Sequence, residues 1–149
     1  MEAVILCGIQ GSGKTTFYLD RFFHTHVRVN LDMLKTRHRE RVLLNACIET
    51  GQRFVVDNTN PTASERRRYV EPARAAGFRA VAYFFSTAPP EAILRNETRL
   101  EKAKIPIAGV LGTYKRQEVP SPSEGFAQLF RVRAQAGRFL VEDLQEVGG

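Results

Sequence analysis

From Ala3 to Phe17 the sequence reads AVILCGIQGSGKTTF, and this stretch decides the fold. Its apolar beginning, Ala3 to Cys7, predicts a strand, and the eight residues that follow have the pattern G-x-x-x-x-G-K-T. Glycines in such a loop let consecutive backbone N–H groups turn inward around phosphate oxygens, at backbone angles that a Cβ would obstruct. The stretch therefore predicts a nucleotide-binding phosphate loop between a strand and a helix.

Each part of this loop has a predicted task. Lys14 brings a positive charge to the β- and γ-phosphates, Thr15 offers a hydroxyl to Mg²⁺, and the helix that follows points its positive end at the anion. ATP and Mg²⁺ are therefore the expected cofactors. We predict that the nucleotide is held by Gly8, Gln10, Gly11, Ser12, Gly13, Lys14, Thr15 and Thr16. The loop alone does not distinguish a switch, a motor and a kinase.

Beyond the loop, short apolar runs alternate with longer amphipathic ones, which is typical of βαβ units around a parallel sheet. We predict an α/β fold with a doubly wound, mainly parallel, five-stranded sheet of the P-loop NTPase and nucleotide-kinase type, and a helical lid at about 95–118. The strands are expected at 3–7, 27–30, 53–57, 78–85 and 126–132. One helix is expected from Asp32 to Thr50, and residues 138–149 are the part that the pattern defines least.

Length and composition predict a single domain that spans 1–149. No apolar run approaches the roughly 20 residues needed to cross a bilayer, and no basic leader precedes the first strand, so we expect a cytoplasmic protein with no membrane partner. Cys7 and Cys47 lack metal-ligand spacing and are expected to be buried thiols. The net charge of +6 favours anionic partners such as nucleic acid, although each arginine, including those at 66–68, is individually expected on a solvated helix face.

Two aspartates and two arginines extend the predicted site. Asp32 follows the second strand, at the sheet edge where doubly wound folds bind ligands, and could accept the proton of an acceptor hydroxyl or simply cap the next helix. Asp57 ends the third strand and could hold Mg²⁺ through water or fix the loop, while residues 58–60 could equally form a turn and a helix cap. Arg95 and Arg99 share a helix face that could close over the phosphates or be surface charge.

With these residues the sequence resembles the kinase domain of the 5′-hydroxyl polynucleotide kinase family, shared by phage polynucleotide kinase and eukaryotic polynucleotide kinase/phosphatases. The resemblance runs from about Val4 to Phe130. It is carried by the loop at 8–16, VNLD at 29–32, VVDNTNP at 55–61 leading to RRY at 67–69, RNETR at 95–99 and SEGF at 123–126.

The resemblance implies a role for each matching residue. Asp32 would be the general base, Lys14 and Thr15 would hold ATP and Mg²⁺, and Arg99, together with Arg95, would contact the transferring phosphates. Asp57 would organise the site as a ligand of metal and substrate.

Two departures from the family concern the acceptor. Leu31 stands where an arginine commonly precedes the base, and Lys35 stands at the place of a basic residue of the phage enzyme. Lys35 is the predicted acceptor contact, and a lysine can neutralise a phosphate but cannot make the planar bidentate contact of an arginine.

We therefore predict an ATP-dependent phosphotransferase that moves the γ-phosphate of ATP to a hydroxyl, with the 5′-hydroxyl of DNA or RNA as the first candidate. We expect no phosphatase segment with this kinase domain, so a role in nucleic acid repair would be limited to phosphorylation unless a partner supplies the rest. Two alternatives stay open: a small-molecule hydroxyl kinase of the same fold, and an ATP-binding regulatory module without catalysis. The sequence leaves the oligomeric state and the choice between ATP and GTP open.

Overall fold

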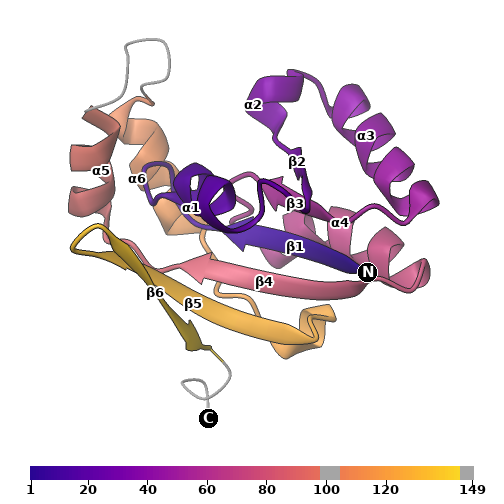
Figure 1. Ribbon diagram of the computed structural model, residues 1–149. Coiled ribbons are helices and arrows are strands. Elements are labelled where there is room, and N and C mark those ends of the chain that lie inside the picture. The colour runs from indigo at the N-terminus through magenta and orange to yellow at the C-terminus, as the bar shows by residue number, and fades with distance from the viewer. Residues whose placement is uncertain (98–104, 145–149) are drawn as a thin grey trace.

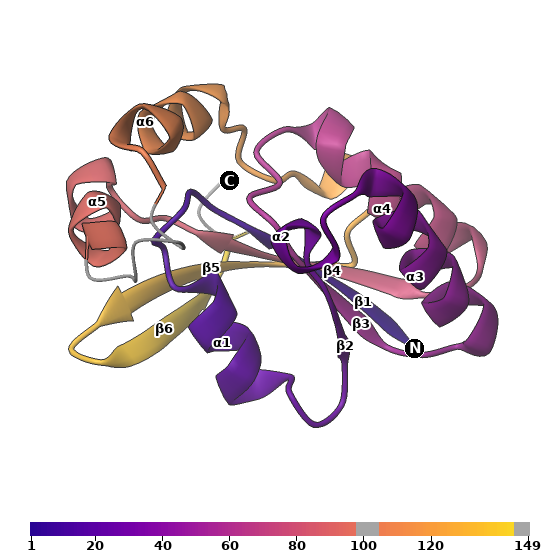
Figure 2. The ribbon, with the colours of Figure 1, turned by 90° about the horizontal axis from the view of Figure 1, so that it is seen from above.

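A computed structural model describes residues 1–97 and 105–144 of the chain. It confirms the α/β class: one sheet is covered by helices on both faces (Figures 1 and 2). In chain order the elements are β1 (Glu2–Cys7), α1 (Lys14–Arg21), β2 (Val27–Val29), α2 (Leu31–Leu34), α3 (Arg37–Thr50), β3 (Phe54–Asp57), α4 (Ala63–Ala75), β4 (Arg79–Phe85), α5 (Pro89–Glu97), α6 (Ile107–Arg116), the 3₁₀ helix η2 (Pro122–Glu124), β5 (Gln128–Gln135) and β6 (Arg138–Asp143).

The described sheet has six strands in the order β2-β3-β1-β4-β5-β6. The first five are parallel, as predicted, but the expected total of five strands is wrong because β6 pairs antiparallel with β5. Ala136 (φ 50°) and Gly137 (φ 75°) form the two-residue turn between them. Positive φ at both central residues matches the right-handed twist of a hairpin, so the chain reverses here instead of crossing over.

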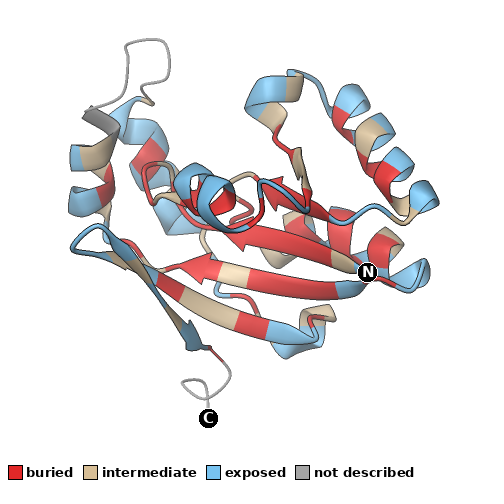
Figure 3. Cartoon of the chain, viewed as in Figure 1, coloured by how far each residue is buried: buried red, intermediate tan, exposed pale blue. Residues whose placement is uncertain are grey.

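The core lies on both faces of the sheet, and the central strands are buried almost throughout (Figure 3). On one face, α3 and α4 pack against Ile5, Val56 and Ala82. On the other face, α1 places Phe17 among strand residues and against the ring of Phe139 of β6, with ring centroids 5.2 Å apart. Strands buried on both faces have near-continuous apolar runs, which is why β1, β3 and β4 were readily predicted.

The helix expected from Asp32 to Thr50 is divided into α2 and α3. Lys35 interrupts it with a φ of 75°, a left-handed conformation that a continuous helix does not allow. Thr36 then begins α3 as its N-cap, because its side chain accepts a hydrogen bond from the Arg39 N–H at 3.2 Å. The break places α2 at the carboxyl end of β2 as a separate short element (Figure 1).

The end of α5 and all of α6 fall in the range predicted for the lid, and the two helices pack against each other beside the phosphate loop (Figure 2). Within 1–97 and 105–144, no helix has the length and apolar character needed to cross a membrane. Both cysteines are buried free thiols, as predicted, and burial raises the pKa of Cys7 to about 12.

Candidate active site

The phosphate loop connects β1 to α1 and has the backbone that its glycines were expected to provide. Gly11 and Gly13 have φ values of 81° and 93°, which L side chains rarely adopt. A Cβ on Gly11 would also collide with the carbonyl oxygen of Ala92 in α5. The glycine requirement at this position therefore comes from both the turn and the close approach of a helix.

Lys14 is buried within the loop to which it belongs. Its Nζ donates to the carbonyl oxygens of Gly8 at 2.7 Å and Ile9 at 2.9 Å. The Gly8 N–H in turn donates to the Thr59 carbonyl at 3.0 Å, which links the loop to the segment after β3. The ammonium group thus lies among the loop residues predicted to surround the nucleotide phosphates.

Asp57, at the end of β3, lies beside Thr15 at the start of α1. The Thr15 hydroxyl donates to Asp57 Oδ2 at 3.0 Å, and Asp57 is only 3% exposed. These are hard oxygen donors of the kind that Mg²⁺ prefers. The described residues contain no group of three or more His, Cys, Asp or Glu side chains that could hold a metal. Thr15 and Asp57 therefore fit a magnesium ion whose other ligands are water and phosphate oxygens.

Arg28 is a site residue that the sequence analysis missed. Its Nε donates to Asp57 Oδ2 at 2.9 Å and its Nη2 donates to the Thr15 hydroxyl at 3.2 Å. The guanidinium therefore neutralises a buried carboxylate beside the phosphate loop. One signal was available: Arg28 lies in a strand that is parallel to β3, so its side chain could reach the carboxyl end of that strand.

Asp32 lies on α2, is exposed, and lines a cleft of about 890 Å³ that the phosphate loop also lines. It is not the N-cap of the helix. That position belongs to Asn30, whose Oδ1 accepts from the Met33 N–H at 2.9 Å and whose Nδ2 donates to the main-chain oxygen of Asp57. The alternative of a capping role for Asp32 is thus wrong, and its carboxylate remains available to the cleft.

The same cleft contains basic side chains from α1, β2, α3, α4 and α6 and from the connection between α2 and α3. Lys14 was predicted as a nucleotide contact and Lys35 as an acceptor contact, whereas the other four were not assigned to the site. The described basic residues that line the cleft are Lys14, Arg28, Lys35, Arg37, Arg68 and Arg116. Its described acidic residues are Asp32, Asp57 and Glu65, so the cleft carries a net positive charge.

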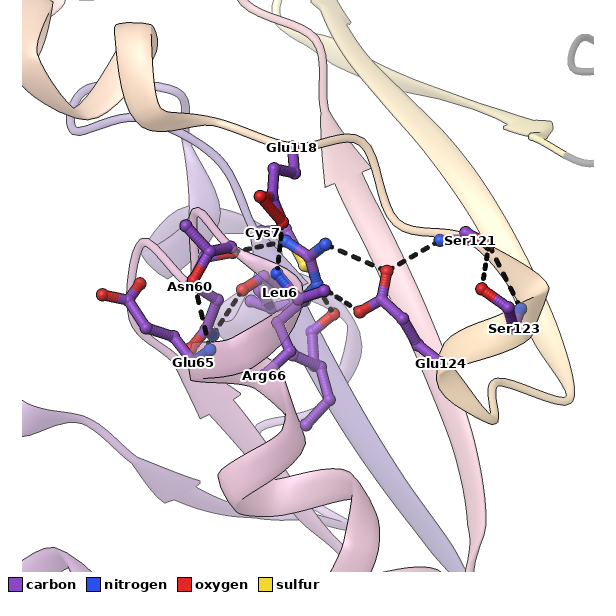
Figure 4. Close-up of polar contacts among 12 residues, drawn as sticks. Leu6, Cys7, Asn60, Glu65, Arg66, Glu118, Ser121, Ser123 and Glu124 are labelled. Carbon is purple, nitrogen blue, oxygen red and sulfur yellow. Dashed lines mark hydrogen bonds and ion pairs between the residues drawn. The ribbon is translucent and has the colours of Figure 1, made fainter.

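The loop after β3 is held by Arg66, which was expected on the surface of α4 but has no exposed area. Arg66 donates to Glu124 from Nε at 2.7 Å and from Nη2 at 3.0 Å, and from Nη1 to the Asn60 carbonyl at 2.8 Å (Figure 4). Asn60 also donates from Nδ2 to the Leu6 carbonyl at 2.8 Å. This cluster joins β1, α4 and η2 beneath the site, and only the distance of 58 residues between Arg66 and Glu124 hid it from the sequence analysis.

Arg95 on α5 lies against the phosphate loop. Its Nη1 is 3.9 Å from the position that a Cβ on Gly13 would take, and its Nη2 is 2.8 Å from Glu91 Oε1. Gln10 of the loop also contacts this side, donating from Nε2 to the Thr113 hydroxyl of α6 at 3.1 Å. Arg99, the second predicted lid arginine, lies outside the described residues.

The AAA domain family matches residues 4–120, which is most of the chain. The chain belongs to this family. As a member of it, the chain has the P-loop kinase fold, a class that uses ATP and Mg²⁺ generally. A solved gluconokinase from Sinorhizobium meliloti 1021 has a similar fold, with a TM-score of 0.61 at 18% identity over 90% of this chain and 83% of that chain.

Two curated relatives are similar to parts of this AAA domain. The bifunctional polynucleotide phosphatase/kinase of Schizosaccharomyces pombe is 35% identical over 77 residues, which are 49% of this chain and 18% of the relative. A putative bifunctional polynucleotide phosphatase/kinase of Acanthamoeba polyphaga mimivirus is 28% identical over 91 residues, which are 60% of this chain and 22% of the relative. The matches thus span about a fifth of the length of these relatives.

Proposed function

We propose that this protein is an ATP-dependent kinase that phosphorylates the 5′-hydroxyl of DNA or RNA, with Asp32 as general base. The observation that carries the proposal is the shared cleft: the phosphate loop after β1 and Asp32 after β2 line the same space at the carboxyl ends of these parallel strands. Phosphoryl transfer requires little covalent chemistry from the protein, so catalysis depends on aligning the acceptor oxygen with the γ-phosphate and on stabilising charge.

In the proposed reaction, Lys14 and Arg95 bind the donor phosphates. Thr15 and Asp57 would hold Mg²⁺, which would supply positive charge to the phosphates. Asp32 accepts the proton of the acceptor hydroxyl as its oxygen forms a bond to the γ-phosphorus, and the bond from that phosphorus to the β–γ bridging oxygen breaks to release ADP. Arg99 is proposed as a further contact to the phosphates of ATP, because of its place in the RNETR segment.

A polynucleotide acceptor is favoured by the charge of the cleft. Lys35, Arg37, Arg68 and Arg116 line it around Asp32, and such side chains suit the phosphates that follow a 5′-terminal nucleoside. The similarity to two polynucleotide phosphatase/kinases supports the same acceptor, although a role in repair would depend on other proteins or segments.

The test is transfer of labelled phosphate from ATP to 5′-hydroxyl oligonucleotides, single- and double-stranded, DNA and RNA, at several salt concentrations. We expect transfer that requires Mg²⁺, disappears in Lys14→Met and weakens steeply with salt, because phosphate contacts release counterions. No transfer to any oligonucleotide, together with transfer to a sugar or another small hydroxyl compound, would favour a small-molecule kinase. ATP binding with no transfer to either class would favour a regulatory module.

A further inference from the structure

Glu40 is a buried carboxylate on α3 that lies outside the cleft. Its side chain is 2% exposed, and three donors surround it. Oε1 accepts from Arg37 Nη1 at 2.9 Å and from the Tyr69 hydroxyl at 3.0 Å, while Oε2 accepts from Asn58 Nδ2 at 3.0 Å. Burial, reinforced by the negative charge of Glu40, raises the pKa of the Tyr69 hydroxyl, which keeps this hydroxyl protonated as a donor.

Asn58 links this carboxylate to the short helix that carries Asp32. Its Nδ2 faces Glu40 and also lies 3.1 Å from the Tyr69 hydroxyl, while its Oδ1 accepts from the Leu31 N–H at 2.9 Å. An ionised carboxylate can only accept hydrogen bonds, so Glu40 specifies that the amino end of the Asn58 amide points toward it. The carbonyl end is then directed at Leu31.

The Leu31 N–H matters because Leu31 is the first residue of α2, and the first N–H groups of a helix have no partner inside it. A helix of four residues gains little stability from its own hydrogen bonds. Its attachment therefore depends on external contacts, namely Asn58 to Leu31 and Asn30 to the end of β3.

We propose that Glu40 is a positioning residue for Asp32, acting through Asn58: it fixes the amide orientation that anchors α2 and so holds the Asp32 carboxylate at the cleft. The anchoring part stands on the geometry alone, whereas the effect on catalysis rests on the proposed role of Asp32 as general base. Arg37 has a different part, because its side chain is half exposed and its Nη1 donates to Glu40 Oε1 and to the Tyr69 hydroxyl and not to Asn58.

The test compares amide hydrogen exchange at Leu31 in Glu40→Gln, Glu40→Met, Asn58→Ala and the double variant Glu40→Met/Asn58→Ala. We expect exchange at Leu31 to accelerate about two- to tenfold in Glu40→Met, the range for one lost hydrogen bond, and less in Glu40→Gln, which retains one acceptor oxygen. If Glu40 acts through Asn58, the double variant matches Asn58→Ala because the two effects are not additive. Arg37→Met is the control and should leave Leu31 protected.

Kinetics give the second readout. The kcat of transfer should be lower in Glu40→Gln than in the wild type and lowest in Glu40→Met, with the KM for ATP unchanged. Unaltered Leu31 exchange in Glu40→Met, or additive effects in the double variant, would overturn the proposal. If Glu40→Met does not fold, the comparison between Glu40→Gln and Asn58→Ala still tests the proposal. Faster Leu31 exchange in Asn58→Ala but unchanged Leu31 exchange in Glu40→Gln would contradict a role of Glu40 through Asn58. A wild-type protein without transfer activity refutes the proposed function and leaves the exchange test intact.

Discussion

Replacing Glu124 by alanine should destabilise the protein strongly, because it leaves the buried guanidinium of Arg66 without its carboxylate partner. Arg66 has no exposed area, and two of its three side-chain hydrogen bonds to described residues go to Glu124. Removing one partner of a buried ion pair costs about 3–5 kcal/mol, since the remaining charge is left without compensation. The Ser121 N–H also loses its acceptor, Glu124 Oε2, at 2.9 Å. For a chain of this size the loss corresponds to a melting temperature lower by about 10 °C.

Urea unfolding followed by circular dichroism measures this cost, and Glu142→Ala is the matched control. Glu142 pairs with Arg133 at 2.7 Å, but the side chains are 44% and 51% exposed. An exposed pair contributes at most about 1 kcal/mol, so the control should unfold almost like the wild type. Equal, small losses for Glu124→Ala and Glu142→Ala would refute the argument that Arg66 depends on Glu124 for its burial.

Three further predictions concern the site and Cys7 at the end of β1. Arg28→Gln removes a positive charge from beside Thr15 and Asp57, so it should lower the Mg²⁺ concentration needed for half-maximal binding of a fluorescent nucleotide about tenfold. Arg41 is an exposed arginine outside the cleft, and Arg41→Gln should leave this concentration unchanged. Lys35→Ala should raise the KM for a 5′-hydroxyl oligonucleotide and reduce the salt slope by about one, with the KM for ATP unchanged. Burial raises the pKa of Cys7 to about 12, so the neutral thiol persists below that pH; native protein at pH 8 should resist alkylation at this residue, as mass spectrometry can show.

The sequence was sufficient where one local pattern determines one structure. The apolar runs of β1, β3 and β4 and the phosphate loop between Cys7 and Lys14 were predicted because burial and backbone geometry restrict those positions directly. In the structure Gly51 caps the end of α3 and Thr62 caps the start of α4, and such end signals of helices are local as well.

Contacts between distant parts of the chain could not be predicted in this way. Arg66 was expected in solvent because nothing near it in sequence indicates that Glu124 completes its hydrogen bonds. Arg28 was missed because its role appears only when β2 and β3 lie side by side. The β5–β6 hairpin was missed although Ala136 and Gly137 form its turn, because alanine is an unusual residue at a positive φ.

The central claim is that Asp32 activates the acceptor hydroxyl. The most direct test measures two quantities in Asp32→Asn: the rate of phosphate transfer to a 5′-hydroxyl oligonucleotide, and the affinity for ATP and Mg²⁺. A general base contributes about 10²–10⁴ in rate, so transfer should fall by that factor while nucleotide binding stays unchanged. Asp20→Asn, an exposed aspartate on α1 outside the cleft, should retain both. Transfer by Asp32→Asn at the wild-type rate would contradict the account.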